Sequence, residues 1–389
     1  KNLWLSIPAL LLSFSIWIMW GVLIKYMKEF GFNFGLTDGL IPGSDEFITK
    51  LNEINNLYYT LPAIAGLAGA TLRLPNSFLI SLAGGRNVIF VTTGLLLIPA
   101  IGTGMALSNI NTPYMFFAVM ALLSGFGGGS FASSMSNISF FYPKKMQGYA
   151  LGMNAGLGNL GVGIMQKLIP MVVTVSLFGG TAGSIATAKG AYFEGLQNAA
   201  WVWVPLVALA TLGAFFGMNN VSTGTPSLPN TAKGIFKTLY MVILGLLAAA
   251  LGAFMLIGLP WADWGMTNFS MWIVLPVVVI VTVLLMKHAT PAEIKGNLKK
   301  QFSILGDKHN WIMTIIYTMT FGSFIGYSMV FPKLAQDIFV YSNPLDPSWA
   351  NPNAPNIMLW AFLGPVMGAL VRPLGGILSD KVNSGAKVT

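Results

Sequence analysis

The chain has no cysteine among its 389 residues, and only 8% of those residues are charged. The absence of cysteine excludes disulfide bonds, thiolate metal sites and a cysteine nucleophile. The two histidines, His288 and His309, lie in one polar stretch, so the sequence offers no metal-ligand cluster and we expect no metal or other cofactor. Soluble domains carry about 25% charged residues, whereas 54% of this chain is hydrophobic. This composition predicts a polytopic membrane protein.

Long apolar runs divide the chain into about ten segments of membrane-crossing length, each expected to be an α-helix because lipid leaves no other way to satisfy the backbone. The fold class predicted is therefore all-α. The predicted spans cover residues 3–27, 54–83, 88–108, 113–142, 147–178, 198–218, 235–259, 269–286, 310–335 and 357–379.

Most basic residues of the loops gather on one side of this arrangement. They are Arg86, Lys144, Lys145, Lys233, Lys237, Lys287, Lys295, Lys299, Lys300, Lys308, Lys381 and Lys387. Most loop acids fall on the other side. By the positive-inside rule, the N-terminus lies in the cytoplasm and the protein in the cytoplasmic (inner) membrane. The same bias explains the net charge of +9 without a nucleic-acid partner.

Two arginines lie inside apolar runs, Arg73 in Leu57–Ala83 and Arg372 in Ile357–Leu378. A cation in a membrane span is costly, so such residues usually face a water-filled path and bind something. The central part of every apolar segment lacks Asp and Glu. The expected partner of the two arginines is therefore an anion that enters from outside.

The two arginines belong to similar motifs, Gly69-Ala-x-x-Arg73 and Gly368-Ala-x-x-Arg372, each near the cytoplasmic end of its span. Equal orientation suggests two parallel repeats, as in the major facilitator superfamily. After Arg372 comes a segment from Gly376 to Asp380 and Lys381 that resembles the conformational loop motif of that superfamily. The matching segment of the first half ends in Arg86 and has no Asp.

The fifth predicted span is rich in glycine and asparagine, which costs helix stability and needs a reason. Helical spacing places Gly148, Gly152, Gly156 and Gly163 on one side, where a second backbone can approach closely. The simpler interpretation is tight packing. The more specific one is a sliding contact between two halves, with Asn154 and Asn159 facing the transport path. The remaining glycines of this run are Gly158 and Gly161.

The run from Gly125 to Pro143, followed by Gly148–Gly163, resembles the nitrate/nitrite porter family of the major facilitator superfamily. So do Leu72–Phe78, Thr320–Gly326 and Gly364–Arg372, and the resemblance covers most of the chain. It implies an anion clamped by the two arginines, with further substrate-binding residues at Phe131, Asn159, Tyr317 and Phe321. Guanidinium presents a planar fork of donors that suits flat nitrate. Rings on both sides would favour a flat anion over a tetrahedral one.

This sequence departs from the family at several points. Ala155 stands where relatives have glycine, and Lys167 adds a charge near the outer end of the fifth span, where it can snorkel or attract anions. Relatives also have a short link where this chain has two extra spans. We therefore expect an N-terminal six-helix bundle over 1–220, a linker with two inserted transmembrane helices over 221–308, and the start of a C-terminal bundle over 309–389. The family would continue with four more spans after Thr389.

The sequence favours a nitrate/nitrite exchanger that works by alternating access as a monomer in the lipid bilayer. Two arginines in an empty site repel each other, and an anion of either kind relieves this. A proton-coupled nitrate symporter is the alternative, although it usually needs a titratable group inside the membrane. A non-transporting sensor of the same fold is a further alternative. The chain has no nucleophile–base constellation and no phosphate loop, so we expect no enzyme.

Overall fold

The computed structural model describes residues 1–175, 177–178, 185–186, 192–193, 195–225, 227–258, 271–342, 349–385 and 387–388. The loop acids Glu194, Asp263 and Asp346 and the loop Lys189 lie outside these residues, as does Thr389. The helices are α1 (Asn2–Ile18), α2 (Trp20–Glu29), α3 (Asp45–Ala83), α4 (Gly85–Gly94), α5 (Leu97–Leu107), α6 (Tyr114–Ser139), α7 (Gln147–Val172), α8 (Asn198–Trp201), α9 (Trp203–Gly217), α10 (Thr231–Ile257), α11 (Met271–His288), α12 (Ala292–Gln301), α13 (Lys308–Phe339) and α14 (Leu363–Val382).

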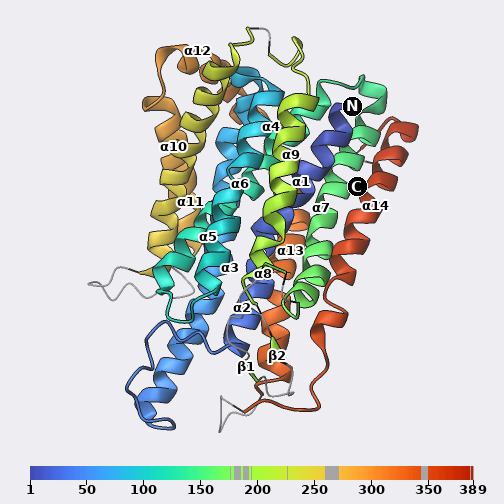
Figure 1. Cartoon of the computed structure of the whole chain (residues 1–389). Coiled ribbons are helices and arrows are strands. Elements are labelled where there is room, and N and C mark those ends of the chain that lie inside the picture. Colours follow the sequence, from blue (N-terminus) through green and yellow to red (C-terminus); the bar gives the residue numbers. More distant parts are fainter. Residues whose placement is uncertain are drawn as a thin grey trace.

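These helices form a bundle of roughly aligned rods (Figure 1). We call the end that carries the N-terminus and α12 the upper end, and the end near β1 (Ile185–Ala186) and β2 (Tyr192–Phe193) the lower end. The two strands pair antiparallel and are the β-structure of the described residues. The predicted all-α class holds apart from this short hairpin.

Each of the ten predicted spans coincides with a helix or with two consecutive helices. Eight segments of the described chain are long and apolar enough to cross a membrane. The glycine-rich α7 is not among them, and Ile273–His288 is a shorter apolar helix whose predicted start at 269 lies outside the described residues. The polar residues of α7 that would face lipid unfavourably, Asn154, Asn159 and Gln166, are all buried against protein.

Helix α3 begins earlier than hydropathy predicts, at Asp45 instead of residue 54. Ser44 caps it, because the Ser44 side chain accepts a hydrogen bond of 3.2 Å from the Phe47 amide. Acidic Asp45 and Glu46 in the first turn complement the helix dipole. The helix is 39 residues long and extends below the neighbouring helices. Hydropathy does not predict this extension because six of its nine residues, 45–53, are polar.

Small residues let α3 and α6 approach closely in the N-terminal bundle. A Cβ on Gly125 would lie 2.5 Å from the Ala68 Cβ, and one on Gly128 would lie 2.6 Å from the Gly69 Cα. Trp17 of α1 fills the space beside Gly69 and donates a hydrogen bond of 2.6 Å to the Ala65 carbonyl. Contacts of this kind fix the position of the helix that carries Arg73.

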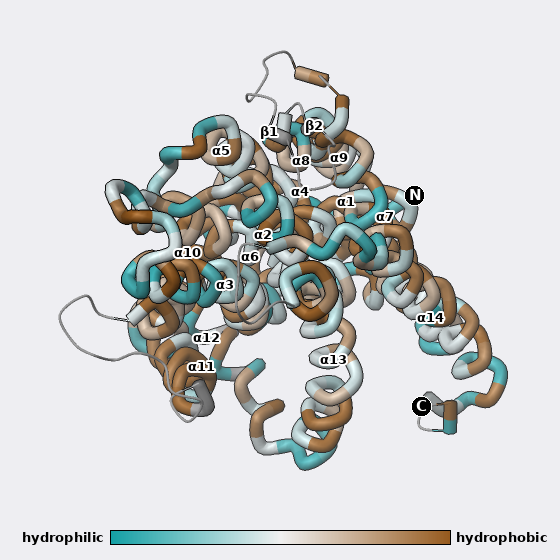
Figure 2. The backbone as a smooth tube through the Cα atoms, turned by 90° about the horizontal axis from the view of Figure 1, so that it is seen from below, coloured by the Kyte–Doolittle hydropathy of each residue, from teal (hydrophilic) through white to brown (hydrophobic). Residues whose placement is uncertain are grey.

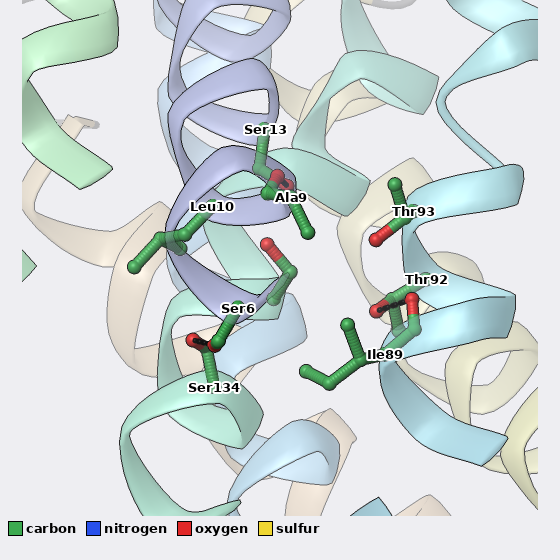
Figure 3. Close-up of a pocket in the computed structure, with 9 residues that line it drawn as sticks. Ser6, Ala9, Leu10, Ser13, Ile89, Thr92, Thr93 and Ser134 are labelled. Atoms are coloured by element: carbon green, nitrogen blue, oxygen red, sulfur yellow. Dashed lines mark hydrogen bonds between the residues drawn. The ribbon is translucent and has the colours of Figure 1, made fainter. Parts of the chain in front are cut away.

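Hydroxyl groups fill a small gap between α1, α4 and α6 (Figure 3). Ser6 and Ser134 share a hydrogen bond of 2.8 Å across two helices, and the Ser134 oxygen also accepts 2.9 Å from the Asn154 amide. The gap has no room for a water molecule. This chain of hydrogen bonds ties α1, α6 and α7 together.

The two extra spans, α10 and α11, pack on the outside of the N-terminal bundle, mainly on α3. Gly245 of α10 lets it approach Pro75 and Leu72, and a Cβ there would lie 2.8 Å from the Pro75 side chain. At the upper end, Lys237 and Lys233 both bind Glu293 of α12, at 2.8 and 3.0 Å. These bonds, that of Lys237 first, hold the pKa of Glu293 below its usual value.

Helices α13 and α14 stand beside the N-terminal bundle at one edge (Figure 2). The buried positions of α13 begin at Phe321, and residues 311–320 are exposed. The second helix, α14, packs along α7. The second half of the described chain therefore meets the first through the lower part of α13 and through the α7–α14 pair.

Candidate functional site

Arg73 lies between helices of both halves. Its Nε donates a hydrogen bond of 3.1 Å to the Gly128 carbonyl of α6, and its Nη1 donates one of 3.2 Å to the Tyr317 hydroxyl of α13. Its Nη2 is buried and has no partner among the described residues. The guanidinium is thus held in place with one donor group left free for a ligand.

Aromatic rings surround this guanidinium. The Arg73 Cζ lies 4.5 Å from the ring centroid of Phe321, 5.0 Å from that of Phe131, 5.4 Å from that of Trp17 and 5.9 Å from that of Tyr317. Contacts of this length over ring faces attract a cation. They lower the cost of keeping a charge inside the bundle in the absence of a carboxylate.

Three of these rings are nearly parallel. Tyr317 and Phe321 stack at 4.9 Å with an interplanar angle of 7°, as their spacing of four residues on α13 allows. Phe131 of α6 stacks on Phe321 at 5.5 Å and 23°. The flat ring faces predicted from the sequence therefore lie together, contributed by one helix from each half.

Arg372 of α14 contacts the same ring cluster. Its Cζ lies 5.3 Å from the Phe321 centroid and 5.6 Å from that of Phe324. Both arginines thus contact Phe321. Neither guanidinium forms an ion pair with a carboxylate within the described parts of the chain, so two like charges share one site with no protein counter-ion.

The glycines of α7 separate into two faces. A Cβ on Gly148, Gly152, Gly156 or Gly163 would collide with α14, for example 2.5 Å from the Pro373 side chain at Gly156. Gly158 and Gly161 instead face α1, where Leu10 and Leu11 approach them. The first face is the close contact between halves that the helical spacing predicted. Its role as a sliding surface stays a prediction.

The two asparagines of α7 differ in their surroundings. Asn154, which we expected to face the transport path, instead directs its amide to Ser134 of α6, because that hydroxyl offers an acceptor inside the N-terminal bundle. Asn159 is fully buried, and neither its amide nitrogen nor its oxygen has a partner among the described residues. An unsatisfied buried amide is costly, so Asn159 has unused capacity for hydrogen bonds to a ligand.

The loop motif at the end of α14 caps α7. The Asp380 carboxylate accepts hydrogen bonds of 2.9 and 2.7 Å from the backbone amides of Gly148 and Tyr149, at the N-terminal end of α7. A carboxylate there complements the helix dipole. Gly376 lies against the Gly148 carbonyl, while Lys381 is exposed. The motif thus holds the two halves together at the upper end.

Sequence reasoning missed several residues of this arrangement. The Gly128 carbonyl and Trp17 were not predicted as partners of Arg73, and Phe324 was not predicted beside Arg372. A buried charge cluster at the lower end, centred on Lys333 and Asp337, was also missed. The sequence carries a signal for this cluster, because Lys333 and Asp337 have opposite charges and stand four residues apart at the end of an apolar span.

No family model matches the chain. Among curated proteins, it is 34% identical over 391 aligned positions to "Nitrate/nitrite transporter NarU" of Escherichia coli (strain K12). It is 32% identical over 393 positions to "Probable nitrate/nitrite antiporter NarK2" of Thermus thermophilus. Each match covers the whole chain, which spans 62% of the first protein and 66% of the second.

Among solved structures, a partially occluded inward-open form of the xylose transporter XylE from E. coli matches the whole chain and 88% of its own, with a TM-score of 0.46 and 12% identity. That likeness is too low to assign a fold by itself. The sequence matches extend over the whole chain, including every motif described above. On their strength, the chain resembles, over its whole length, the nitrate/nitrite porter family of the major facilitator superfamily.

Proposed function

We propose that this chain forms the anion-binding part of a carrier that exchanges nitrate and nitrite across the cytoplasmic membrane, with its N-terminus in the cytoplasm. The observation that carries the proposal is the meeting of Arg73 and Arg372 at one ring, Phe321, without a carboxylate. Two cations so placed need an anion between them, and the part of the chain that the structure describes supplies none.

The chemistry of the site suits a small, flat oxyanion. Arg73 keeps its Nη2 free, and the fork of Arg372 forms no hydrogen bond within the described residues. Planar guanidinium groups pair with planar oxyanions through two parallel hydrogen bonds. The stacked rings of Phe131 and Phe321, with centroids 5.5 Å apart, present flat faces beside the two guanidiniums, which favour a flat ion over a tetrahedral one.

Exchange follows from the charge of the empty site. Without a ligand, the two guanidiniums repel each other in a medium of low dielectric constant, so closure around an empty site is unfavourable. Nitrate and nitrite carry the same charge and relieve the repulsion equally. Both T. thermophilus relatives carry the words "nitrate/nitrite antiporter" in their names, which supports this coupling. The chain acts here as a single-copy carrier and not as an enzyme.

One observation favours proton-coupled uptake as the second candidate. Asp337, which the sequence placed in a loop, lies inside the lower contact between the halves and is largely buried. A titratable group is therefore present at the halves' interface. It is engaged by Lys333 and Lys28, and it is remote from the ring cluster by four helical turns of α13, so we place it second.

The full-length protein in liposomes tests the two couplings. We expect labelled nitrate to enter when the lumen holds nitrite, and to enter at a background rate when the lumen holds gluconate. A pH gradient, acidic outside, should not drive uptake into gluconate-filled vesicles. Uptake driven by that gradient alone would establish the symporter instead, and absence of nitrate flux under both conditions would refute a carrier.

A further inference from the structure

Asp337 and Lys333 form the centre of a buried charge cluster at the lower end. The Lys333 side chain is 0% exposed, and its Nζ lies 2.6 Å from a carboxylate oxygen of Asp337. The same Nζ donates 2.7 Å to the Asn55 side chain of α3. Asp337 also accepts 2.7 Å from the Tyr59 hydroxyl and pairs with Lys28 at 3.0 Å. One α13 pair thus binds both α2 and α3.

A second set of bonds lies beside the first. Gln336 of α13 donates 3.1 Å to the Glu29 carboxylate and 3.3 Å to the Lys25 carbonyl, both on α2. Lys25 in turn pairs with Glu29 at 2.7 Å. We call these groups together the lower network. It comprises Lys25, Lys28, Glu29, Asn55, Tyr59, Lys333, Gln336 and Asp337.

An apolar layer lies above the lower network, toward the ring cluster. Met329, one helical turn before Lys333, is 4% exposed. A Cβ on Gly21 of α2 would lie 2.5 Å from the Met329 carbonyl oxygen, so the two backbones touch there. At this point α2 and α13 leave no room between them even for a methyl group. The charge pairs and the close backbone contact therefore both lie on the boundary between α2 and α13, which we call the seam, at successive levels.

A cavity adjoins the lower network on its other side. This cavity of about 440 Å³ is lined by Lys28, Glu29, Asn55, Tyr58, Asp337 and Tyr341, among others. Two of these residues are carboxylates, which disfavours the cavity as a store for anions. It instead gives the charges of the network a place to be hydrated when their pairs separate.

We propose that the lower network is a latch that closes the anion site toward the lower face, the extracellular face in the proposed orientation. The inference rests on the proposed carrier function, since a carrier must part α2 from α13 to open there. A buried ion pair adds little net stability, because desolvation offsets much of the attraction. Rehydration in the adjoining cavity therefore lets such a latch open and close reversibly, whereas apolar packing alone would oppose parting.

A single reporter cysteine tests the latch, because residues 1–389 contain no native cysteine that would react in its place. Met329→Cys is placed behind the network, and a membrane-impermeant maleimide is added outside cells that express the full-length protein. We expect slow labelling in this background. Adding Asp337→Asn leaves Lys333 without its counter-ion, and labelling should accelerate about tenfold. An unchanged rate would overturn the latch.

Matched variants separate opening from unfolding. Glu53→Gln removes the exposed Lys50–Glu53 pair of α3 and should leave labelling of Met329→Cys unchanged. The double variant Asp337→Asn with Lys333→Gln removes the pair without leaving a buried charge, and it should also accelerate labelling. A cysteine at Val207, in the core and away from the seam, should stay protected in every variant. Acceleration at Val207 as well would mean unfolding and would refute the latch.

A second pair of variants tests the backbone contact. Gly21→Ala places a methyl group against the Met329 carbonyl and should accelerate labelling. Gly66→Ala would approach only the end of the Met329 side chain, at 3.5 Å, which the Met329→Cys background removes, so this variant should not accelerate labelling. Equal labelling of the two variants would contradict a closed seam. Because labelling requires no nitrate, these results stand or fall separately from nitrate exchange in liposomes.

Discussion

Arg73 and Arg372 occupy the same place in two similar motifs, yet their surroundings differ. Arg73 donates to the Gly128 carbonyl and the Tyr317 hydroxyl and has four rings within 5.9 Å of its Cζ. Arg372 has two rings within 5.6 Å and, among the described residues, no hydrogen bond. One guanidinium is fixed by the protein, and the other is oriented only by ring faces.

This difference assigns the two arginines different parts in anion binding. The protein contacts of Arg73 already offset the cost of burying its charge, so Arg73 can act as a preformed half of the anion site. Arg372 has its full fork of donors available, and an anion would give those donors their first partners. The ligand therefore does more to order Arg372 than Arg73. Binding would draw α14 toward the ring cluster, which couples occupancy to the contact between the halves.

The largest expected effect is that of Arg73→Lys. An ammonium group cannot serve Gly128, Tyr317 and an anion with the geometry of a fork. Loss of roughly 3 kcal/mol of charge-assisted hydrogen bonding corresponds to about a 100-fold weaker nitrate affinity. Isothermal titration of the purified protein with nitrate measures this. Arg86→Lys, which changes a guanidinium bound to Thr231 at the upper end, is the control and should bind normally.

Arg372→Lys should weaken nitrate binding less, by about tenfold. Lysine here gives up the second arm of the fork toward the anion, a loss of about 1.4 kcal/mol, but it breaks no hydrogen bond within the described protein. The same titration applies. An effect larger than that of Arg73→Lys would show that Arg372, and not Arg73, is the principal anchor, and it would reverse the comparison.

The sequence predicted that Arg73 and Arg372 share one site because cations inside apolar runs violate a strong rule. Arg73 and Arg372 lie in apolar runs without an acid, and the resemblance then added Phe131, Tyr317 and Phe321. The structure places these five residues together. The sequence could not have predicted the Gly128 carbonyl as a partner of Arg73. Every residue has a carbonyl, and only the approach of α3 to α6 selects this one.

The fold was predicted at the level of spans but not of their partners. Hydropathy locates α10 and α11 without indicating that they pack on α3. It also ended the ninth span at residue 335, which left Asp337 as a loop acid and separated it from Lys333. In the structure, α13 continues to Phe339 and the two side chains meet. Helical spacing of opposite charges would have corrected this boundary.

The smallest of these effects concerns Tyr317, the residue by which the second half contacts Arg73. Tyr317→Phe keeps the ring stacked on Phe321 and removes only the hydroxyl that accepts from Arg73. A hydrogen bond of this kind contributes about 1 kcal/mol, so nitrate affinity should fall about fivefold. Tyr327→Phe, on the same helix but stacked on Phe331, should leave affinity unchanged. If Tyr317→Phe also leaves affinity unchanged, Arg73 is held by the N-terminal bundle alone. Its preformed geometry would then owe nothing to the second half, and only Arg372 would bring the second half to the anion.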